Sequence, residues 1–244
     1  MLSIVDFILR KVLTVRPLVK IGFYLLIVTS ASVIGDIARP KPSYFSDKKN
    51  VFNQYFVKLG WGWSLANVSA FLLLANLIEH RGKLEALARP ICRELLLTTY
   101  WYICTHSFEW LENFTGSCSN SKLSSKRPCL RDGHDWLGFD ISGHTFLLVH
   151  CLLFINEESG IVHRIAKKLD EQEREHHLSR DYPIQPSRCK RLLRIVSFVL
   201  LFFTFLWEFM LLCTALYFHT TAQKLLGMAF AIGGWFLVYR LLKI

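Results

Sequence analysis

The sequence lacks the cysteine and carboxylate patterns that hold metal ions. Seven cysteines occur among 244 residues, but no two of them form a CxxC pair, so no zinc framework is expected. The sequence also has no evident cluster of carboxylates that would suggest a catalytic metal. We therefore expect neither a metal nor another cofactor.

The marks of a cleavable signal peptide are absent too. Asp6, Arg10 and Lys11 interrupt the first apolar stretch, and no small-residue cleavage site follows it. Repeats and low-complexity tracts are also absent. We expect the first apolar run to stay in the protein as a membrane anchor.

The composition favours a membrane protein. Hydrophobic residues make up 52% of the chain and aromatic residues 14%, which is high for a soluble domain. The net charge of +10 does not indicate nucleic-acid binding, because the basic residues flank the apolar runs and the aromatic residues lie inside them. We expect membrane lipid, and no nucleic acid, among the partners.

Six apolar runs are long enough to cross a membrane as helices. We therefore predict an all-α, polytopic membrane protein with six transmembrane helices in a single integral membrane domain, residues 1–244. The fifth run is the clearest because Glu208 is its only charge from 195 to 218, and the third is the weakest because its middle is polar and aromatic. The predicted spans are about 18–35, 57–78, 92–111, 141–157, 194–218 and 221–241.

Charge and modification signals predict the orientation of these spans. Lys and Arg concentrate at the two termini, in the 79–94 loop and in the 158–193 loop, so these parts are expected in the cytosol. The 158–193 loop mixes both signs of charge and is predicted to form a solvated helix followed by a linker. Asn113 begins a glycosylation sequon on the other, lumenal side. Cys118 and Cys129 lie in the same loop, where they form a disulfide or remain free thiols.

This topology brings two histidines to one membrane face. His144 begins the fourth span and His219 ends the fifth, so both approach the lumenal side from different helices. His150 lies six residues beyond His144 and is expected to be a packed, hydrogen-bonded helix residue. The competing interpretation is that His144 and His219 are interfacial residues with satisfied hydrogen bonds and that Ser-Gly is an ordinary helix entry.

The residues around the two histidines favour an anion. Asp140 or Ser142 can cap the fourth helix, whose free N–H groups would then face the lumen, and Gly143 allows close approach to the backbone. Lysines near both histidines add positive charge on the same side. The candidate substrate-binding residues are Ser142, Gly143, Lys224, Lys48 and Lys49.

Five segments, in order along the chain, carry a family resemblance. They are DKKNVFNQYFVKLGWGW (47–63), YWYICT (100–105), TGSC (115–118), GFDISGHTFLL (138–148) and LLCTALYFHTTAQKLLG (211–227). Together they resemble the fat storage-inducing transmembrane protein family of the endoplasmic reticulum. The similarity runs from about residue 40 to 230 and is weak in the first 35 residues and in the 160–192 loop.

The resemblance implies a six-span protein with cytosolic termini that is needed for lipid-droplet formation and is related to lipid phosphate phosphatases. It implies His144 as the general acid and His219 as the nucleophile. The implied reaction is cleavage of the diphosphate of fatty acyl-CoA, which releases acyl 4′-phosphopantetheine and adenosine 3′,5′-bisphosphate. Two other activities stay open: non-enzymatic binding of diacylglycerol and triacylglycerol for droplet budding, and hydrolysis of a lipid phosphate.

The sequence departs from the phosphatase pattern around both histidines. Ile141 stands where proline precedes Ser-Gly-His, and Gln223 stands where an acid follows the second histidine. Lys122 and Arg127-Pro128 do not have the spacing of the usual basic motif. Glu208 is a separate question, because an acid inside a span is expected to have a function or a partner. It is interpreted as a partner for a neighbouring helix or as a protonated residue facing a cavity.

Overall fold

The computed structural model describes residues 11–120, 122–176 and 186–243, and these residues are almost entirely helical. The α-helices are α2 (Pro17–Ala38), α3 (Gly60–His80), α4 (Ala88–Thr115), α5 (Lys126–Arg131), α6 (Gly143–Ser159), α7 (Val162–His176), α8 (Pro186–Tyr217) and α9 (Thr221–Phe236). Shorter 3₁₀ and π segments are η1 (Tyr44–Ser46), η2 (Phe52–Val57), η3 (Leu84–Leu87) and η4 (Leu237–Leu241). Strands β1 (Ser117–Cys118) and β2 (Trp136–Leu137) pair antiparallel.

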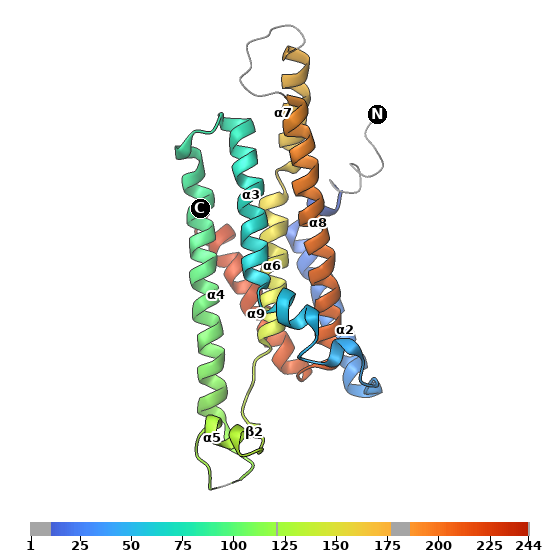
Figure 1. The fold of residues 1–244 in the computed structure, drawn as a ribbon, viewed down its shortest axis with the longest axis vertical. Helices are drawn as coiled ribbons and strands as arrows, with labels where there is room; N and C mark the ends of the chain where they lie inside the picture. Colours follow the sequence, from blue (N-terminus) through green and yellow to red (C-terminus); the bar gives the residue numbers. More distant parts are fainter. Residues whose placement is uncertain (1–10, 121, 177–185, 244) are drawn as a thin grey trace.

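The long helices α2, α3, α4, α6, α8 and α9 run alternately up and down between two ends of the molecule (Figure 1). We call the end where α6 begins and α8 ends the histidine end, since His144 and His219 lie there. The other end carries the C-terminus of α3, the N-terminus of α4 and all of α7. The short turn between α8 and α9 makes these two helices antiparallel neighbours, whereas longer segments connect α2 to α3 and α4 to α6.

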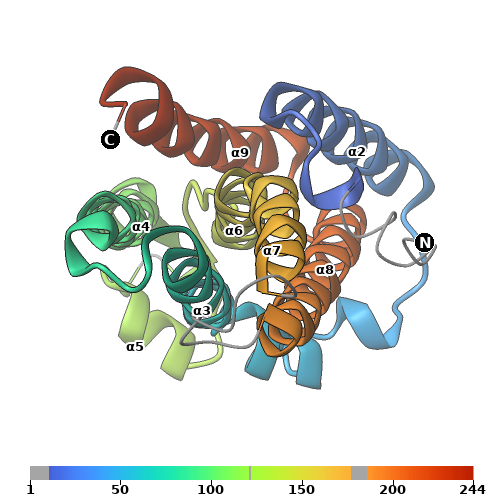
Figure 2. The same cartoon turned by 90° about the horizontal axis from the view of Figure 1, so that it is seen from above.

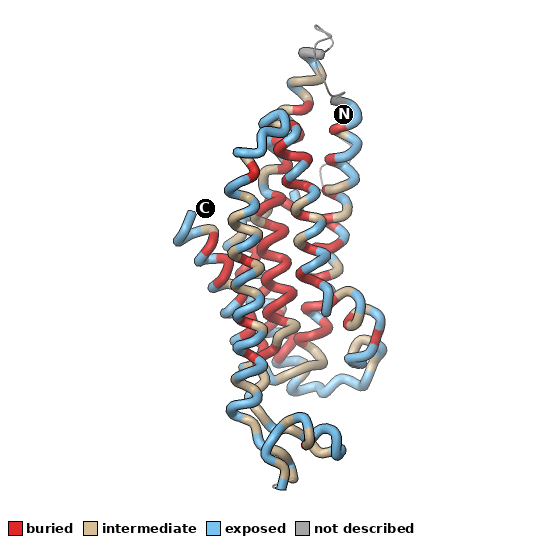
Figure 3. Tube along the Cα trace, turned by 60° about the vertical axis from the view of Figure 1, so that its left-hand side comes forward, coloured by how far each residue is buried: buried red, intermediate tan, exposed pale blue. Residues whose placement is uncertain are grey.

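Helix α6 is the centre of the bundle, and the other long helices surround it (Figure 2). It is apolar on all sides, so it is stable only when other helices cover every face. Its span is 83% buried, the highest share among the candidate spans, and buried residues concentrate in this central column (Figure 3). A rigid, fully packed helix therefore holds the residues at its first turn in place.

In the part of the chain that the structure describes, five helices are long and apolar enough to cross a membrane: Pro17–Ala38, Gly60–His80, Gly143–Arg174, Ser187–Tyr217 and Thr221–Leu241. Large apolar side chains lie exposed on these helices, as lipid-facing residues would; on α8 they include Phe198, Phe202 and Phe205. The protein is thus a polytopic membrane protein. The remaining predicted span, 92–111, forms the middle of the 28-residue α4, which is long enough but is not among the five, because its centre is rich in polar and aromatic residues.

The 158–193 loop is more helical than expected. A helix, α7, is present where the solvated helix was expected, and it follows α6 after a break at Gly160 and Ile161. Only one side of it is exposed, because Ile165 and Leu169 are buried. Helix α8 begins at Pro186, well before the predicted start of the fifth span at 194. The linker between them falls outside the described residues.

Cys118 and Cys129 are joined by a disulfide, which closes the small lobe built from β1, α5 and β2 beyond the end of α4.

Glu208 accepts hydrogen bonds from Lys20 (2.7 Å) and Tyr24 (3.1 Å) on α2. The interpretation of Glu208 as a partner for a neighbouring helix is therefore confirmed, and the charge inside the span is paired.

Candidate functional site

A cavity of about 310 Å³ opens at the histidine end, between the start of α6, the lower half of α4 and the α8–α9 turn. His144 and His219 both line it, so the fold brings to one cavity the two histidines that the topology predicted on one face. The remaining lining residues are Lys48, Asn53, Thr105, Phe108, Glu109, Glu112, Asp140, Ile141, Gly143 and Phe218.

The first turn of α6 sets the position of His144. Ser142 is the N-cap: its hydroxyl accepts a hydrogen bond from the N–H of Thr145 at 3.3 Å. Because Ser142 rather than Asp140 caps the helix, the Asp140 side chain is available for another contact. The N–H groups of Gly143 and His144 have no acceptor within the helix, and a side chain added at Gly143 would meet no atom within 4 Å. Gly143 and His144, whose N–H groups are free, both line the cavity.

Helix α9 docks directly on this turn. The N–H of Ser142 donates to the carbonyl of Gln223 at 3.1 Å. One turn later, a Cβ at Gly227 would lie 2.5 Å from the Ser142 carbonyl oxygen, so only glycine permits this approach. The two segments that carry the histidines are thus fastened to each other through backbone contacts.

His219 occupies the tight turn between α8 and α9. Its φ of 55° is in the left-handed region, where residues other than glycine are uncommon and cluster at functional sites. A capping box follows at once, in which the Gln223 side chain accepts from the N–H of Thr220 at 2.9 Å. Gln223, which replaces the acid of the phosphatase pattern, therefore caps α9 instead of contacting His219.

The carboxylate that faces His219 is that of Asp140. Its Oδ2 lies 3.5 Å from Nδ1 of His219. Burial lowers the pKa of His219, and the neighbouring Asp140 partly offsets this, while Lys48 and Lys224 add to the lowering. Burial also raises the pKa of Asp140, against the effect of His219. At neutral pH the His219 imidazole is therefore mostly uncharged, as a nucleophile requires.

Lys48 is the lysine that the structure places on the cavity wall. Its segment is held by side-chain amides: Asn53 donates to the carbonyl of Asp47 at 3.0 Å, and Gln54 donates to the carbonyl of Lys48 at 2.9 Å. The expected partner Lys49 is exposed and does not line the cavity.

Lys224 is also absent from the lining of the cavity. Its side chain is buried, and Nζ donates to the carbonyl of Ala215 at 2.7 Å, where it satisfies a free carbonyl near the end of α8. Its spacing to His219 predicted a direct contact with an anion in the cavity. The Lys224 side chain does not reach the cavity, so this contact is not made. Its charge acts on the site through space, as the lowered pKa of His219 indicates.

The wall contributed by α4 is acidic, which the sequence did not suggest. Glu109 and Glu112 line the cavity together with Asp140, and Lys126 pairs with Glu112 at 2.6 Å. The sequence places both acids near the end of the third predicted span but does not show that this side of the helix faces His144 and His219. Over the ranges that the structure describes, no group of three or more His, Cys, Asp or Glu residues is arranged to hold a metal ion.

The remaining site predictions concern residues outside the cavity. Asn113 is exposed in the last turn of α4, at the histidine end. The hydroxyl of Thr115 in the same sequon donates to Leu111 at 2.8 Å and accepts from the N–H of Phe139 at 2.9 Å. His150 is packed against Trp61 and Phe146, as expected, although its Nε2 has no hydrogen-bond partner among the described residues.

Comparison with known proteins places the chain among relatives with names that state an activity. The acyl-coenzyme A diphosphatase FITM2 of Mus musculus is 38% identical over 218 residues, covering 86% of this chain and 77% of that protein. The protein of the same name from Homo sapiens is 35% identical with the same coverage. The one from Drosophila melanogaster is 32% identical over 251 residues, covering 95% of this chain and 59% of that protein.

No solved structure matches the chain. The family model described as fat storage-inducing transmembrane protein matches residues 41–116 and 111–239, which include every residue that lines the histidine cavity. With this match and relatives of 32–38% identity along most of its length, the chain belongs to the fat storage-inducing transmembrane protein family.

Proposed function

We propose that the protein is a fatty acyl-CoA diphosphatase of the endoplasmic reticulum membrane, and that it supports lipid-droplet formation and lipid homeostasis there. The products would be acyl 4′-phosphopantetheine and adenosine 3′,5′-bisphosphate. The observation that carries the proposal is that His144 and His219, from different helices, line one cavity at the end of an apolar bundle. The activity in the names of the relatives supports it.

In the proposed first step, Nε2 of neutral His219 attacks one phosphorus of the diphosphate. A P–N bond forms, the P–O bond of the anhydride breaks, and His144 donates a proton to the departing phosphate oxygen. In the second step water attacks the same phosphorus, His144 takes a proton from it, and the P–N bond breaks. Covalent catalysis of this kind divides one difficult displacement into two easier ones.

Asp140 is proposed as the positioning residue for His219. A proton on Nδ1, facing the carboxylate at 3.5 Å, leaves the lone pair of Nε2 for attack. This is the task that the acid after the second histidine would have in the phosphatase pattern. Here Gln223 caps α9 instead, and the carboxylate comes from the segment just before α6.

The phosphate oxygens would be stabilised by few groups. The N–H groups of Gly143 and His144, at the positive end of the α6 dipole, and the ammonium of Lys48 are available for this purpose. The acyl chain would lie against the exposed apolar faces of the helices, with the nucleotide in water. This places the diphosphate at the membrane surface, at the depth of the two histidines.

We further propose that α4 crosses the membrane as a sixth span, which leaves both termini in the cytosol and the histidine cavity in the lumen. The alternating course of the helices supports this, since α4 connects one end of the bundle to the other (Figure 1). The disulfide between Cys118 and Cys129 supports an oxidising environment at the histidine end. Glycan attachment at Asn113 in cells would agree with this orientation, and modification by a reagent confined to the cytosol of a cysteine introduced at Asn120 would contradict it.

One observation favours a non-enzymatic function as the second candidate. Three acids line the cavity against a single lysine, so the site is less basic than a diphosphate pocket usually is. A protein that binds diacylglycerol and triacylglycerol would not need an anion site there.

The experiment that separates the candidates compares purified protein in detergent with oleoyl-CoA, phosphatidic acid or diacylglycerol. Mass spectrometry identifies the products for wild type, His144→Ala and His219→Ala, and His163→Asn serves as the control because His163 is an exposed histidine of α7, at the other end. We expect acyl phosphopantetheine from wild type and the control only. Equal release by all four proteins would exclude the two-histidine mechanism, and preferred hydrolysis of phosphatidic acid would identify a lipid phosphatase.

A further inference from the structure

A second cavity, of about 540 Å³, lies at the opposite end of the bundle. Its walls come from the end of α3, the start of α4, the connection between α6 and α7, and η4 with the residues after it. Its charged and polar lining residues are Asn76, Glu79, His80, Arg89, Arg93, Glu157, Glu158, Arg164, Tyr239 and Lys243. None of them belongs to the histidine cavity.

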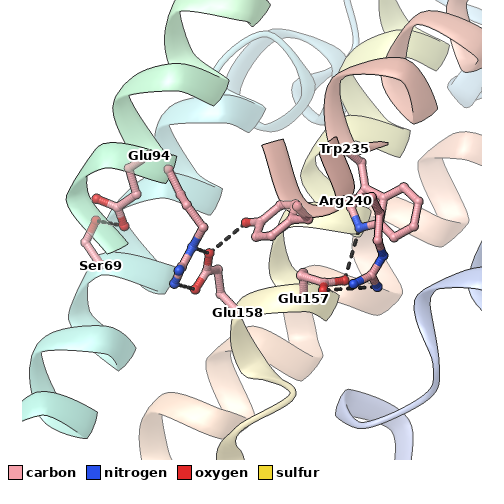
Figure 4. A network of polar contacts seen from close by, with 8 residues as sticks. Ser69, Glu94, Glu157, Glu158, Trp235 and Arg240 are labelled. Carbon is pink, nitrogen blue, oxygen red and sulfur yellow. Dashed lines mark hydrogen bonds and ion pairs between the residues drawn. The ribbon is translucent and has the colours of Figure 1, made fainter. Parts of the chain in front are cut away.

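The acids of this second cavity are paired within the protein. Glu158 is held by both Nε and Nη2 of Arg93, at 2.6 and 2.7 Å, and by the hydroxyl of Tyr239 at 2.7 Å. Glu157, beside it at the end of α6, accepts from Nε1 of Trp235 at 3.0 Å (Figure 4). Because these donors neutralise the two carboxylates and hold them in place, the acids would repel an anionic ligand only weakly.

Glu79, on the α3 side of the cavity, is paired in the same way. Arg164 of α7 contacts its two carboxylate oxygens at 2.6 and 3.1 Å. Arg89 and Lys243, by contrast, are exposed at the mouth, and no acid among the described residues pairs with either of them. The mouth therefore presents two cations that can receive an anion.

Asn76 provides a second, independent indication of a ligand. The residue is only 7% exposed and lines the cavity, and its Oδ1 has no hydrogen-bond partner among the described residues. A buried acceptor without a donor destabilises the folded protein. A ligand hydroxyl or ammonium group in the cavity would supply the missing donor.

The surroundings of the mouth indicate a lipid instead of a soluble anion. Leu84 in η3, Ile91 in α4 and Leu241 in η4 are 81%, 49% and 64% exposed, and each lies within five residues of Arg89 or Lys243 in the sequence. Exposed leucines and isoleucines next to basic residues at helix ends are typical of the membrane surface, where acyl chains cover the former and phosphates pair with the latter.

We propose that this cavity binds the headgroup of an anionic phospholipid, with its phosphate on Arg89 and Lys243 and a headgroup hydroxyl or ammonium on Asn76. The proposal does not depend on the hydrolysis of acyl-CoA. The site would fix the end of the bundle to the membrane leaflet opposite the histidine cavity. A phosphatidylinositol or phosphatidylserine headgroup has both the anion and the donor.

The test is native mass spectrometry of the full chain in detergent, titrated with phosphatidylinositol, phosphatidylserine, phosphatidylcholine or inositol 1-phosphate. The variant Arg89→Ala/Lys243→Ala removes two exposed cations that pair with no acid of the described residues, so the fold should persist. Its control, Lys83→Ala/Lys167→Ala, removes two exposed cations near the same end that do not line the cavity. We expect the first variant to weaken binding of both anionic lipids about tenfold, and the control to weaken it about twofold or less.

Asn76→Leu tests the donor contact separately. It should weaken binding of phosphatidylinositol and leave unchanged the lower affinity for phosphatidylcholine, which has no donor in its headgroup. An equal loss in the control pair, equal binding of phosphatidylcholine and phosphatidylinositol by wild type, or equally tight binding of inositol 1-phosphate would each overturn the proposal. The first two results would show a non-specific surface effect, and the third a site for a soluble anion.

Discussion

The carboxylate of Asp140 lies 3.5 Å from Nδ1 of His219, although the two residues come from different connections of the bundle. The contact depends on three local features: Ser142 caps α6, Thr220 and Gln223 form the capping box of α9, and Gly227 lets the two helices touch. His219 thereby gains an oriented imidazole with one nitrogen facing the acid. The proposed mechanism requires this orientation.

Asp140→Asn should lower kcat for oleoyl-CoA by about tenfold to a hundredfold and change KM less, because the nucleophile loses its orientation while the anion donors remain. The measurement is steady-state release of acyl phosphopantetheine. Asp140→Glu should restore part of the rate. If Asp140→Asn had the wild-type kcat, the positioning role would be wrong.

The pH profile of the same variants separates a positioning role from a structural one. His219 must be neutral to attack, so activity should fall as pH drops through its pKa. Burial lowers this pKa, so the acid limb of kcat/KM in wild type should lie below about 6.5. Asp140 stabilises the charged imidazole, so Asp140→Asn should move the limb to still lower pH. An unchanged limb together with a lower plateau would indicate a structural effect alone.

Gly227→Ala should disturb the site without touching either histidine. Its Cβ would lie 2.5 Å from the carbonyl oxygen of Ser142, so α9 must move away from α6, at a cost of about 1–3 kcal/mol. We expect a lower unfolding temperature and at least a tenfold loss of activity. Gly62→Ala in α3 is the matched control, because a Cβ there meets no atom within 4 Å. Similar losses in both variants would argue against the proposed contact between α6 and α9.

The backbone at His219 predicts which substitutions are tolerated. Its φ of 55° suits asparagine but is strained for β-branched residues. His219→Asn should therefore keep the thermal stability of wild type, whereas His219→Val should lose about 1–3 kcal/mol. Thermal unfolding in detergent measures the difference. Equal stability of the two variants would show that the turn is not held in this conformation.

Substitution of Glu109 should improve substrate binding, in contrast to the substitutions above. Its carboxylate is exposed on the cavity wall, where it repels a diphosphate. Glu109→Gln should lower KM for oleoyl-CoA a few-fold at low salt and leave kcat unchanged, and the effect should shrink as salt screens the charge. A higher KM would mean that Glu109 contacts the substrate through a hydrogen bond instead.

Much of the fold follows from features that a sequence shows directly. Apolar runs such as 195–218 predict helices, and the positions of His144 and His219 at helix ends predict that they meet at one face. The contact between Asp140 and His219 could not be predicted in this way, because it depends on which of two capping residues is used and on how α9 approaches α6. The direction of the Lys224 side chain could not be predicted for a similar reason, since it is set by a free carbonyl at Ala215.

Helix α4 shows a second limit. Its apolar content alone does not distinguish a membrane span from an ordinary long helix, and its acids appear as wall residues only after α6 is in place. In contrast, α6 could be recognised as central from its lack of any polar face. The hydrophobic pattern of the sequence therefore predicts which helices form and which one is buried by the others. The side-chain contacts between helices can be seen only in the structure.

The central claim is that His219 is the nucleophile in a folded, membrane-embedded diphosphatase. The most direct measurement is the rate at which purified His219→Asn converts oleoyl-CoA to acyl phosphopantetheine, after its unfolding temperature has been shown to equal that of wild type. The mechanism predicts a loss of at least about a hundredfold, because the covalent step is removed. Release at the wild-type rate by this folded variant would contradict it.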